Sequence, residues 1–233
     1  SMIQNIMSTE CRHADSKKVL DRIRQGKWRG KIEPIRNTYK RTMRQTQDAK
    51  KAKKSIAPLK RQLPGILWAG QFSERKATAI KEHSGLLVID LDDIPHHKFT
   101  QAEEQLKSDE CVWSFFVSPS GGGLKVLFRI PPDSSRHGDA WYTAVDRIKK
   151  LTGLDADMSG KDVARLCFVS YDPDLYFNPH AEELPVTRSL PRKQMPPPLN
   201  ANPPADISCR HRIAEELLGS VEWTDQVTGF IMC

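Results

Sequence analysis

The sequence has no apolar run that approaches the roughly 18 residues of a membrane-spanning helix, and we expect no membrane partner. No signal-peptide pattern occurs at the N-terminus, and the seven histidines show no metal-ligand spacing. The cysteines are few, odd in number and without a CxxC pair: Cys11, Cys111, Cys167, Cys209 and Cys233. This usage excludes a disulfide scaffold and predicts a reducing, cytoplasmic environment.

Positive charge is distributed unevenly along the chain. Residues 1–65 contain 18 Lys and Arg against 5 Asp and Glu, whereas the remaining residues contain 18 against 24. The basic first third, in which Trp28 and Tyr39 are interleaved, predicts an acidic polymer as partner. We expect residues 1–65 to form a largely helical region packed on the core, and the acidic remainder to suit a cation-binding site.

Hydrophobic patterns predict an α+β core over residues 66–184. Its strands and helices follow the order β-α-β-β-α-β, which is typical of an RRM-like or ferredoxin-like palm. Right-handed crossovers then give an antiparallel sheet with strand order 4-1-3-2. The predicted strands are 85–91, 112–117, 124–130 and 165–170, and the predicted core helices are 99–107 and 136–151. Further helices are expected at 16–24, 41–61 and 74–83.

The C-terminal part of the chain has a different composition. Prolines are dense over residues 185–206, which predicts a semi-rigid linker. Residues 207–233, with an expected helix at 208–219, read as the start of a following module. We therefore expect the chain to be a fragment of a longer protein.

The strongest candidate for chemistry is the acidic end of the first core strand. Asp90 and Asp92 are two residues apart, so the period of a strand directs both carboxylates to one face. Two neighbouring carboxylates repel each other unless a cation neutralises them. Mg²⁺ is commonly held by one or two carboxylates together with substrate phosphates. Asp93 points to the other face and is expected to cap the loop.

A glycine-rich turn joins the second and third core strands. Its glycines allow backbone N–H groups to approach an anion, and its serines add donors. Lys125 opens the third strand beside the Asp90/Asp92 pair, where a triphosphate would lie. This is not a Walker loop, because a strand follows the lysine. The predicted nucleotide-binding residues here are Ser118, Ser120, Gly121, Gly122, Gly123 and Lys125.

A third acidic element, residues 154–162, precedes the fourth core strand. A carboxylate from this segment can join Asp90 and Asp92 in a site for two metals about 3.5–4 Å apart, the arrangement that supports in-line displacement at phosphorus. Asp157 is the preferred third ligand, with Asp155 left open as the alternative. Arg165 opens the fourth strand and can reach a phosphate or an acidic neighbour.

Together these three elements resemble the motifs of the archaeo-eukaryotic primase superfamily. The segments that carry the likeness are Leu87 to Asp92, Ser118 to Lys125 and Asp155 to Asp157. Residues 118–125 and 165–173 more narrowly resemble the VirE N-terminal-like primase-polymerase domains of mobile elements, phages and some CRISPR loci. Upstream segments at 63–64, 68–72 and 83–85 fit the same branch, so the resemblance covers roughly residues 35–180.

The resemblance implies a catalytic palm in which Asp90, Asp92 and Asp157 bind two Mg²⁺ or Mn²⁺ ions. It implies nucleoside triphosphates as substrates and single-stranded DNA as template and primer. A zinc-like module or a helicase commonly follows such domains. The superfamily's second motif usually ends in a histidine that contacts the incoming phosphates, and here Lys125 stands at that place.

Two other functions compete with template-directed synthesis. One is a non-catalytic nucleic-acid-binding module on the same fold, because RRM-like sheets bind RNA by stacking bases on exposed aromatics. The other is a different metal-dependent enzyme on a palm-like sheet, such as a nucleotide cyclase or a nuclease.

Overall fold

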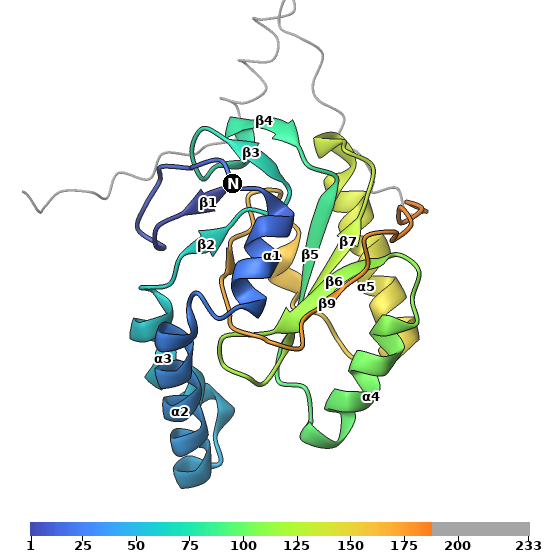
Figure 1. Ribbon diagram of the computed structural model, residues 1–233. Coiled ribbons are helices and arrows are strands. Elements are labelled where there is room, and N and C mark those ends of the chain that lie inside the picture. Colours follow the sequence, from blue (N-terminus) through green and yellow to red (C-terminus); the bar gives the residue numbers. More distant parts are fainter. Residues whose placement is uncertain (188–233) are drawn as a thin grey trace, which may run out of the picture. The chain divides into compact units, whose positions relative to one another are not determined.

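The computed structural model describes residues 1–187. The predicted module at 207–233, including the helix expected at 208–219, lies outside the described residues, as does all but the first part of the predicted linker at 185–206. The described chain contains both helices and strands in runs, with α1 to α3 in succession (residues 16–60) and then β2 to β5 (residues 65–91) (Figure 1). The fold is therefore of the α+β class, with antiparallel sheets.

The strands of residues 1–187 form three separate sheets. In chain order they are β1 (Met2–Ile3), β2 (Gly65–Ile66), β3 (Gly70–Phe72), β4 (Ile80–His83), β5 (Leu86–Leu91), β6 (Val112–Val117), β7 (Leu124–Arg129), β8 (Cys167–Phe168) and β9 (Tyr176–Phe177). The largest sheet has the order β5-β7-β6-β9, a second has the order β1-β2-β8, and β3 pairs with β4. All strand pairs within these sheets are antiparallel.

Residues 1–187 contain five α-helices. They are α1 (Ser16–Arg24), α2 (Arg29–Thr46), α3 (Ala49–Lys60), α4 (His96–Lys107) and α5 (His137–Thr152). Short 3-10 turns occur at Ala77–Ala79, Ser134–Arg136 and Met158–Gly160. Aspartates begin α1 and α3: Asp15 accepts a hydrogen bond from the Lys18 N–H, and Asp48 accepts from the N–H groups of Lys50 and Lys51.

Both faces of the largest sheet are covered, because successive residues of β5 alternate between two apolar clusters. Leu86 and Val88 join a cluster that includes Ile23 of α1 and Ile32 of α2. Leu87, Ile89 and Leu91 join the other cluster, which includes residues of α4 and α5. Figure 1 shows α4 and α5 together on one side of the sheet and α1 on the other. The strand period that buries Val88 also directs Asp90 to the α1 side.

The predicted sheet order is only partly correct. The neighbours β5, β7 and β6 reproduce the expected order of the first three core strands. The predicted fourth strand does not pair with β5: only Cys167–Phe168 is extended, and it pairs with Gly65–Ile66. Gly65 permits this pairing, because a Cβ there would lie 2.0 Å from Leu166 Cδ1. The outer edge of β5 instead receives a hydrogen bond of 2.9 Å from the Asp157 N–H to the Asp90 carbonyl.

Two of the other predicted elements differ from the structure. The helix expected at 74–83 is a 3-10 turn followed by β4, because the segment folds back and pairs with β3. The single helix expected at 41–61 is the end of α2 and the whole of α3. Gln47, in the left-handed conformation, ends α2, and Asp48 starts α3. The helix expected at 16–24 coincides with α1.

None of the helices in residues 1–187 combines the length and the apolar character needed to cross a membrane.

A histidine pair, half-buried His83 and buried His137, joins β4 to the start of α5. The Gly85 N–H donates to Nδ1 of His83, which assigns the ring proton of neutral His83 to Nε2. Nε2 lies 3.1 Å from Nδ1 of His137 and therefore donates to it. Burial lowers the pKa of both rings, and for His137 the His83 ring adds to the effect and the pKa falls to about 4.

We expect this pair to make folding stability depend on pH. Because the folded pKa of His137 lies below the ordinary 6.5, the unfolded chain binds more protons between these values. Stability should therefore fall by about 3 kcal/mol as the pH drops from 6.5 to 4. Urea unfolding at several pH values measures this change. His137→Gln should remove most of this dependence of the free energy of unfolding on pH. The control His180→Gln, at an exposed site, should keep it. If the wild type and both variants show the same dependence on pH, the assignment to His137 is wrong.

Candidate functional site

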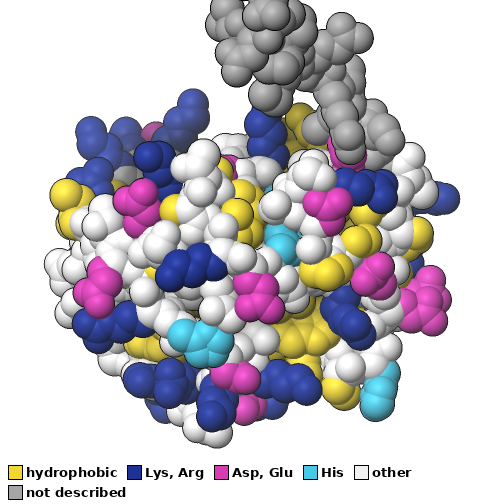
Figure 2. Space-filling model, turned by 90° about the horizontal axis from the view of Figure 1, so that it is seen from above, with side chains coloured by type: hydrophobic (Ala, Val, Ile, Leu, Met, Phe, Trp, Pro, Cys, Tyr) yellow, Lys and Arg dark blue, Asp and Glu magenta, His cyan; other side chains and the backbone are white. Residues whose placement is uncertain are grey.

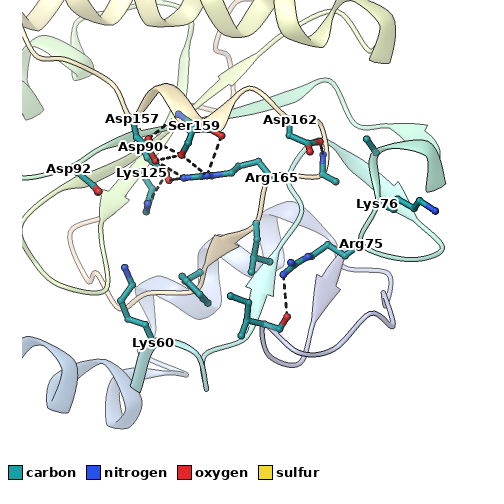
Figure 3. A pocket seen from close by; sticks show the side chains of 15 residues that line it. Lys60, Arg75, Lys76, Asp90, Asp92, Lys125, Asp157, Ser159, Asp162 and Arg165 are labelled. Carbon is teal, nitrogen blue, oxygen red and sulfur yellow. Dashed lines mark hydrogen bonds and ion pairs between the residues drawn. The ribbon is translucent and has the colours of Figure 1, made fainter. Parts of the chain in front are cut away.

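A pocket of about 740 Å³ lies beside the C-terminal end of β5 (Figure 3). Its walls come from α3, the β3–β4 connection, β5, β7 and the segment that leads into β8. Charged side chains dominate its lining. They are Asp90, Asp92, Asp157, Asp162, Lys60, Arg75, Lys76, Lys125 and Arg165.

Asp90 and Lys125 form a buried ion pair at the centre of this pocket. The antiparallel register sets Asp90 of β5 directly opposite Lys125 of β7. The Lys125 Nζ lies 2.7 Å from Oδ1 of Asp90, and the two side chains are only 11% and 7% exposed. Burial opposes both charges, but the pair outweighs it: the pKa of Asp90 is lowered and the pKa of Lys125 is raised. Both groups are therefore charged at neutral pH.

Arg165 connects Asp90 to Asp157. Its Nη2 donates to Oδ2 of Asp90 at 3.0 Å and to Oδ2 of Asp157 at 2.8 Å. Ser159 fixes the carboxylate of Asp157 by donating its backbone N–H and its hydroxyl. Although burial acts the other way, the Ser159 and Arg165 donors lower the pKa of Asp157. The predicted convergence of Asp90, Asp157, Lys125 and Arg165 thus occurs without the predicted pairing of the fourth strand with β5.

Asp157 and Asp155 lie in different surroundings. Asp157 lines the pocket, whereas the Asp155 side chain is 86% exposed and pairs with Lys149 of α5 at 2.7 Å. Of the two alternatives left open by the sequence, only Asp157 is near Asp90.

Asp92 lies at the rim of the pocket rather than at its centre. Its side chain is half exposed, and Oδ2 lies 3.3 Å from Nζ of Lys53 on α3. The same ammonium lies 2.6 Å from Asp93, whose backbone is in the left-handed conformation at φ 53°. Lys53 thus holds α3 against the acidic end of β5.

The glycine-rich turn does not line the pocket. Ser118, Ser120, Gly121, Gly122 and Gly123 are all absent from its walls. A Cβ on Gly123 would lie 2.2 Å from the Leu91 carbonyl oxygen, and Gly121 has φ +82°. These glycines are therefore required by the tight link between β6 and β7.

The same turn packs against α2 instead. The Arg36 guanidinium donates to the carbonyl groups of Ser118 and Tyr171, at 3.3 and 2.7 Å. The ring of Tyr39 lies next to Gly122. The nucleotide contact predicted for the turn therefore stays a prediction. Of the residues predicted for it, Lys125 alone lines the pocket.

The oxygen ligands needed for a hard cation are present, but positive side chains already neutralise them. Within residues 1–187, no three Asp, Glu, His or Cys side chains converge closely enough to hold one metal ion. Oδ1 of Asp90 is nevertheless buried, and the Lys125 ammonium, 2.7 Å away, is its one close partner among the described residues. That oxygen retains a lone pair for a ligand, so the donor chemistry fits a divalent cation once Lys125 and Arg165 shift.

Three cations of the pocket were not singled out from the sequence. Lys60 is one of many lysines in a basic helix, and nothing in its neighbours distinguishes it. Arg75 and Lys76 fall in the segment that was expected to be helical. Only the tertiary fold brings these side chains to the same cavity as Asp90.

Residues 58–177 match the family described as "BT4734-like, N-terminal domain". The match covers more than half of the chain and includes every lining residue of the pocket except Ile6. Neither the curated proteins nor the solved structures contain a match to this chain.

Proposed function

We propose that this chain, which belongs to the BT4734-like, N-terminal domain family, is a primase-polymerase. In this proposal the pocket carries out template-directed nucleotidyl transfer. The observation that supports the proposal most is that Asp90, Asp92 and Asp157 line one cavity together with several cations. Polyphosphate chemistry requires both kinds of group, because cations bind the phosphates and carboxylates bind metals. We further propose a role in replication of a mobile element, a phage or a CRISPR-associated system.

The central part of the fold supports a palm-like core. Strands β5, β7 and β6 are neighbours in the order expected for the first three palm strands. The acidic end of β5 opens into the pocket, as the resemblance to primase-polymerases requires. Because β8 belongs to another sheet, the structure supports three of the four expected palm strands and not the fourth.

In this proposal Asp90, Asp92 and Asp157 would hold two Mg²⁺ or Mn²⁺ ions. When bound, these ions supply charge stabilisation for the attacking 3′-hydroxyl and for the leaving pyrophosphate. Lys125 and Arg165 then exchange their carboxylate contacts for phosphate oxygens. Ser159 keeps Asp157 oriented through the hydrogen bonds that it donates.

The template contact is proposed for the basic helices α2 and α3. Figure 1 shows them as an adjacent pair that extends away from the largest sheet. Trp28 belongs to the apolar core, so its ring is not available to stack on a base. Figure 2 shows a face on which Lys and Arg are interspersed with Asp and Glu, so the positive charge of the chain is not concentrated there. Charge on α2 and α3, rather than aromatic stacking, is therefore the expected source of affinity for a single strand.

Primer extension tests the proposal directly. The protein, a primed single-stranded DNA template and dNTPs or NTPs should give extended products with Mg²⁺ or Mn²⁺, and none with excess EDTA. Re-addition of Mn²⁺ should restore synthesis. An absence of products with every metal and nucleotide combination would falsify the proposal, and cyclic nucleotides or cleaved DNA would support the cyclase or nuclease alternative.

The RNA-binding alternative receives less support from the structure. Trp113, Phe115, Phe116 and Phe128 are buried between the sheet and its helices. A sheet covered on both faces offers no aromatic platform for bases. Salt-dependent binding of RNA without metal-dependent synthesis would nevertheless favour a non-catalytic module.

A further inference from the structure

The cations of the pocket divide into two groups according to their partners. Lys125 and Arg165 are committed to Asp90 and Asp157. Lys60, Arg75 and Lys76 line the same cavity, and the ion pairs of the described residues include none of these three. Arg75 donates a hydrogen bond to the Ile6 carbonyl, a neutral acceptor that leaves its charge uncompensated. The second group therefore keeps positive charge available to a ligand.

Lys60 faces the carboxylate side of the pocket from the opposite wall. Figure 3 shows it across the cavity from Lys125 and Asp90, with Arg75 farther along and Lys76 at the far end, where its ammonium is directed outwards. Lys60 lies in the last turn of α3, and its ammonium lies 5.7 Å from the centroid of the Phe168 ring. A ring attracts an ammonium without neutralising it, so Phe168 supports Lys60 and leaves its charge available.

The electrostatic position of Lys60 is unfavourable in the absence of a bound anion. Burial lowers the pKa of Lys60, and the Lys125 ammonium lowers it further. The carboxylates of Asp92 and Asp90 offset only part of this effect. An anion between the two lysines would reduce their mutual repulsion and stabilise both charged forms. The distribution of charge thus favours a ligand with several negative groups, which extends from Lys125 towards Arg75 and Lys76.

We propose that Lys60, with Arg75 and Lys76, forms a binding subsite for the polyphosphate chain of a nucleotide, on the wall opposite Lys125. The subsite deepens the proposed function and rests on it for the identity of the nucleotide. It differs from the glycine-rich turn that the sequence pointed to, which lies outside the pocket. The affinity for polyphosphate itself requires no metal and no catalysis.

Calorimetric titration of the full chain with inorganic tripolyphosphate, in EDTA, tests the subsite. Wild-type protein should bind, and Lys60→Gln should weaken binding about tenfold, the loss expected for one charge-assisted contact. Adding Lys76→Gln should weaken binding further. The matched control Lys98→Gln/Lys150→Gln removes two exposed lysines on α4 and α5 and should bind as the wild type does.

Two further ligands distinguish the phosphates of a free nucleotide from those of a nucleic-acid strand. The deoxynucleotide dTTP should lose affinity in Lys60→Gln, whereas a short oligothymidylate should lose little. The subsite is refuted if wild-type protein does not bind tripolyphosphate, if Lys60→Gln binds it normally, or if the control pair weakens it equally. The subsite is also refuted if Lys60→Gln loses affinity for the oligothymidylate alone, because Lys60 then contacts a nucleic-acid strand and not a nucleotide.

The subsite and the proposed function can fail separately. Tripolyphosphate binding through Lys60 in a protein that does not extend primers preserves the subsite and refutes the polymerase. Conversely, primer extension with an unchanged KM for dTTP in Lys60→Gln preserves the polymerase and refutes the subsite.

Discussion

Replacing Asp90 and Asp92 together by alanine is expected to reduce nucleotide incorporation by about a thousandfold or more. Metal-bound carboxylates stabilise developing charge by several kcal/mol, and each 1.36 kcal/mol corresponds to a tenfold change in rate. Both residues line the pocket, and Asp90 carries the buried oxygen whose one close partner among the described residues is the Lys125 ammonium. Primer extension with Mg²⁺ and with Mn²⁺, at matched protein concentrations, measures the loss.

The pair Asp155 and Asp157 provides the matched control for this experiment. Asp157→Ala should lose activity to a similar extent, because its carboxylate lies 2.8 Å from Arg165 in the pocket. Asp155→Ala should keep wild-type activity, because that side chain is exposed and pairs with Lys149. Full activity in the Asp90→Ala/Asp92→Ala protein, or equal losses at positions 155 and 157, would exclude the proposed site.

Folding must be checked separately, because Asp90 is buried against Lys125. The Asp90→Asn/Asp92→Asn variant keeps the size of both side chains and can accept the hydrogen bond from Arg165. It should lose stability, because the Lys125 ammonium loses its carboxylate partner, but without denaturant it should retain the wild-type circular dichroism spectrum while it loses activity. A folded but inactive asparagine variant separates the chemical role from the structural one.

Lys125→Ala is expected to destabilise the fold by about 3 kcal/mol, at the lower end of the range for breaking a buried ion pair. Removal of the ammonium leaves the Asp90 carboxylate with Arg165 as its remaining charged partner and opens space beside it. The effect is large because Asp90 is only 7% exposed, so water cannot replace the lost charge. Urea unfolding at neutral pH gives the free energy directly.

A double variant identifies the origin of that loss. In Asp90→Asn/Lys125→Met the unpaired charge is absent, so most of the stability should return. Lys54→Ala, at an exposed lysine of α3, should change stability by less than about 0.5 kcal/mol. If Lys125→Ala and the double variant are equally unstable, packing rather than charge explains the loss.

Some features of the fold could be predicted because they depend on local pattern. The strand 86–91 has six consecutive buried residues, and its apolar run was readable without any partner. The helix at Ser16–Arg24 begins at the Asp15 cap and buries residues at helical spacing. The pairing of β5 with β7 followed from the order of elements, and it brings Lys125 opposite Asp90.

Other features could not be predicted, because short segments take their structure from distant partners. Residues 80–83 form a strand only because β3 lies alongside, and their own sequence also suits a helix. Cys167–Phe168 is too short to determine its own neighbour, and pairing with Gly65–Ile66 depends on a glycine about 100 residues earlier in the chain.

By itself the sequence determined that a buried strand of an α+β protein ends in the acidic residues Asp90 and Asp92. It also determined that Lys125 lies beside this acidic end. Only the tertiary structure decided that Asp157 rather than Asp155 approaches Asp90, that the glycine-rich turn faces α2, and that Lys60 closes the pocket from the opposite side. The physical reason is that strand period and hydrophobic pattern act between near neighbours. The composition of a pocket depends on which distant segments pack together, and on which charges they bring into contact.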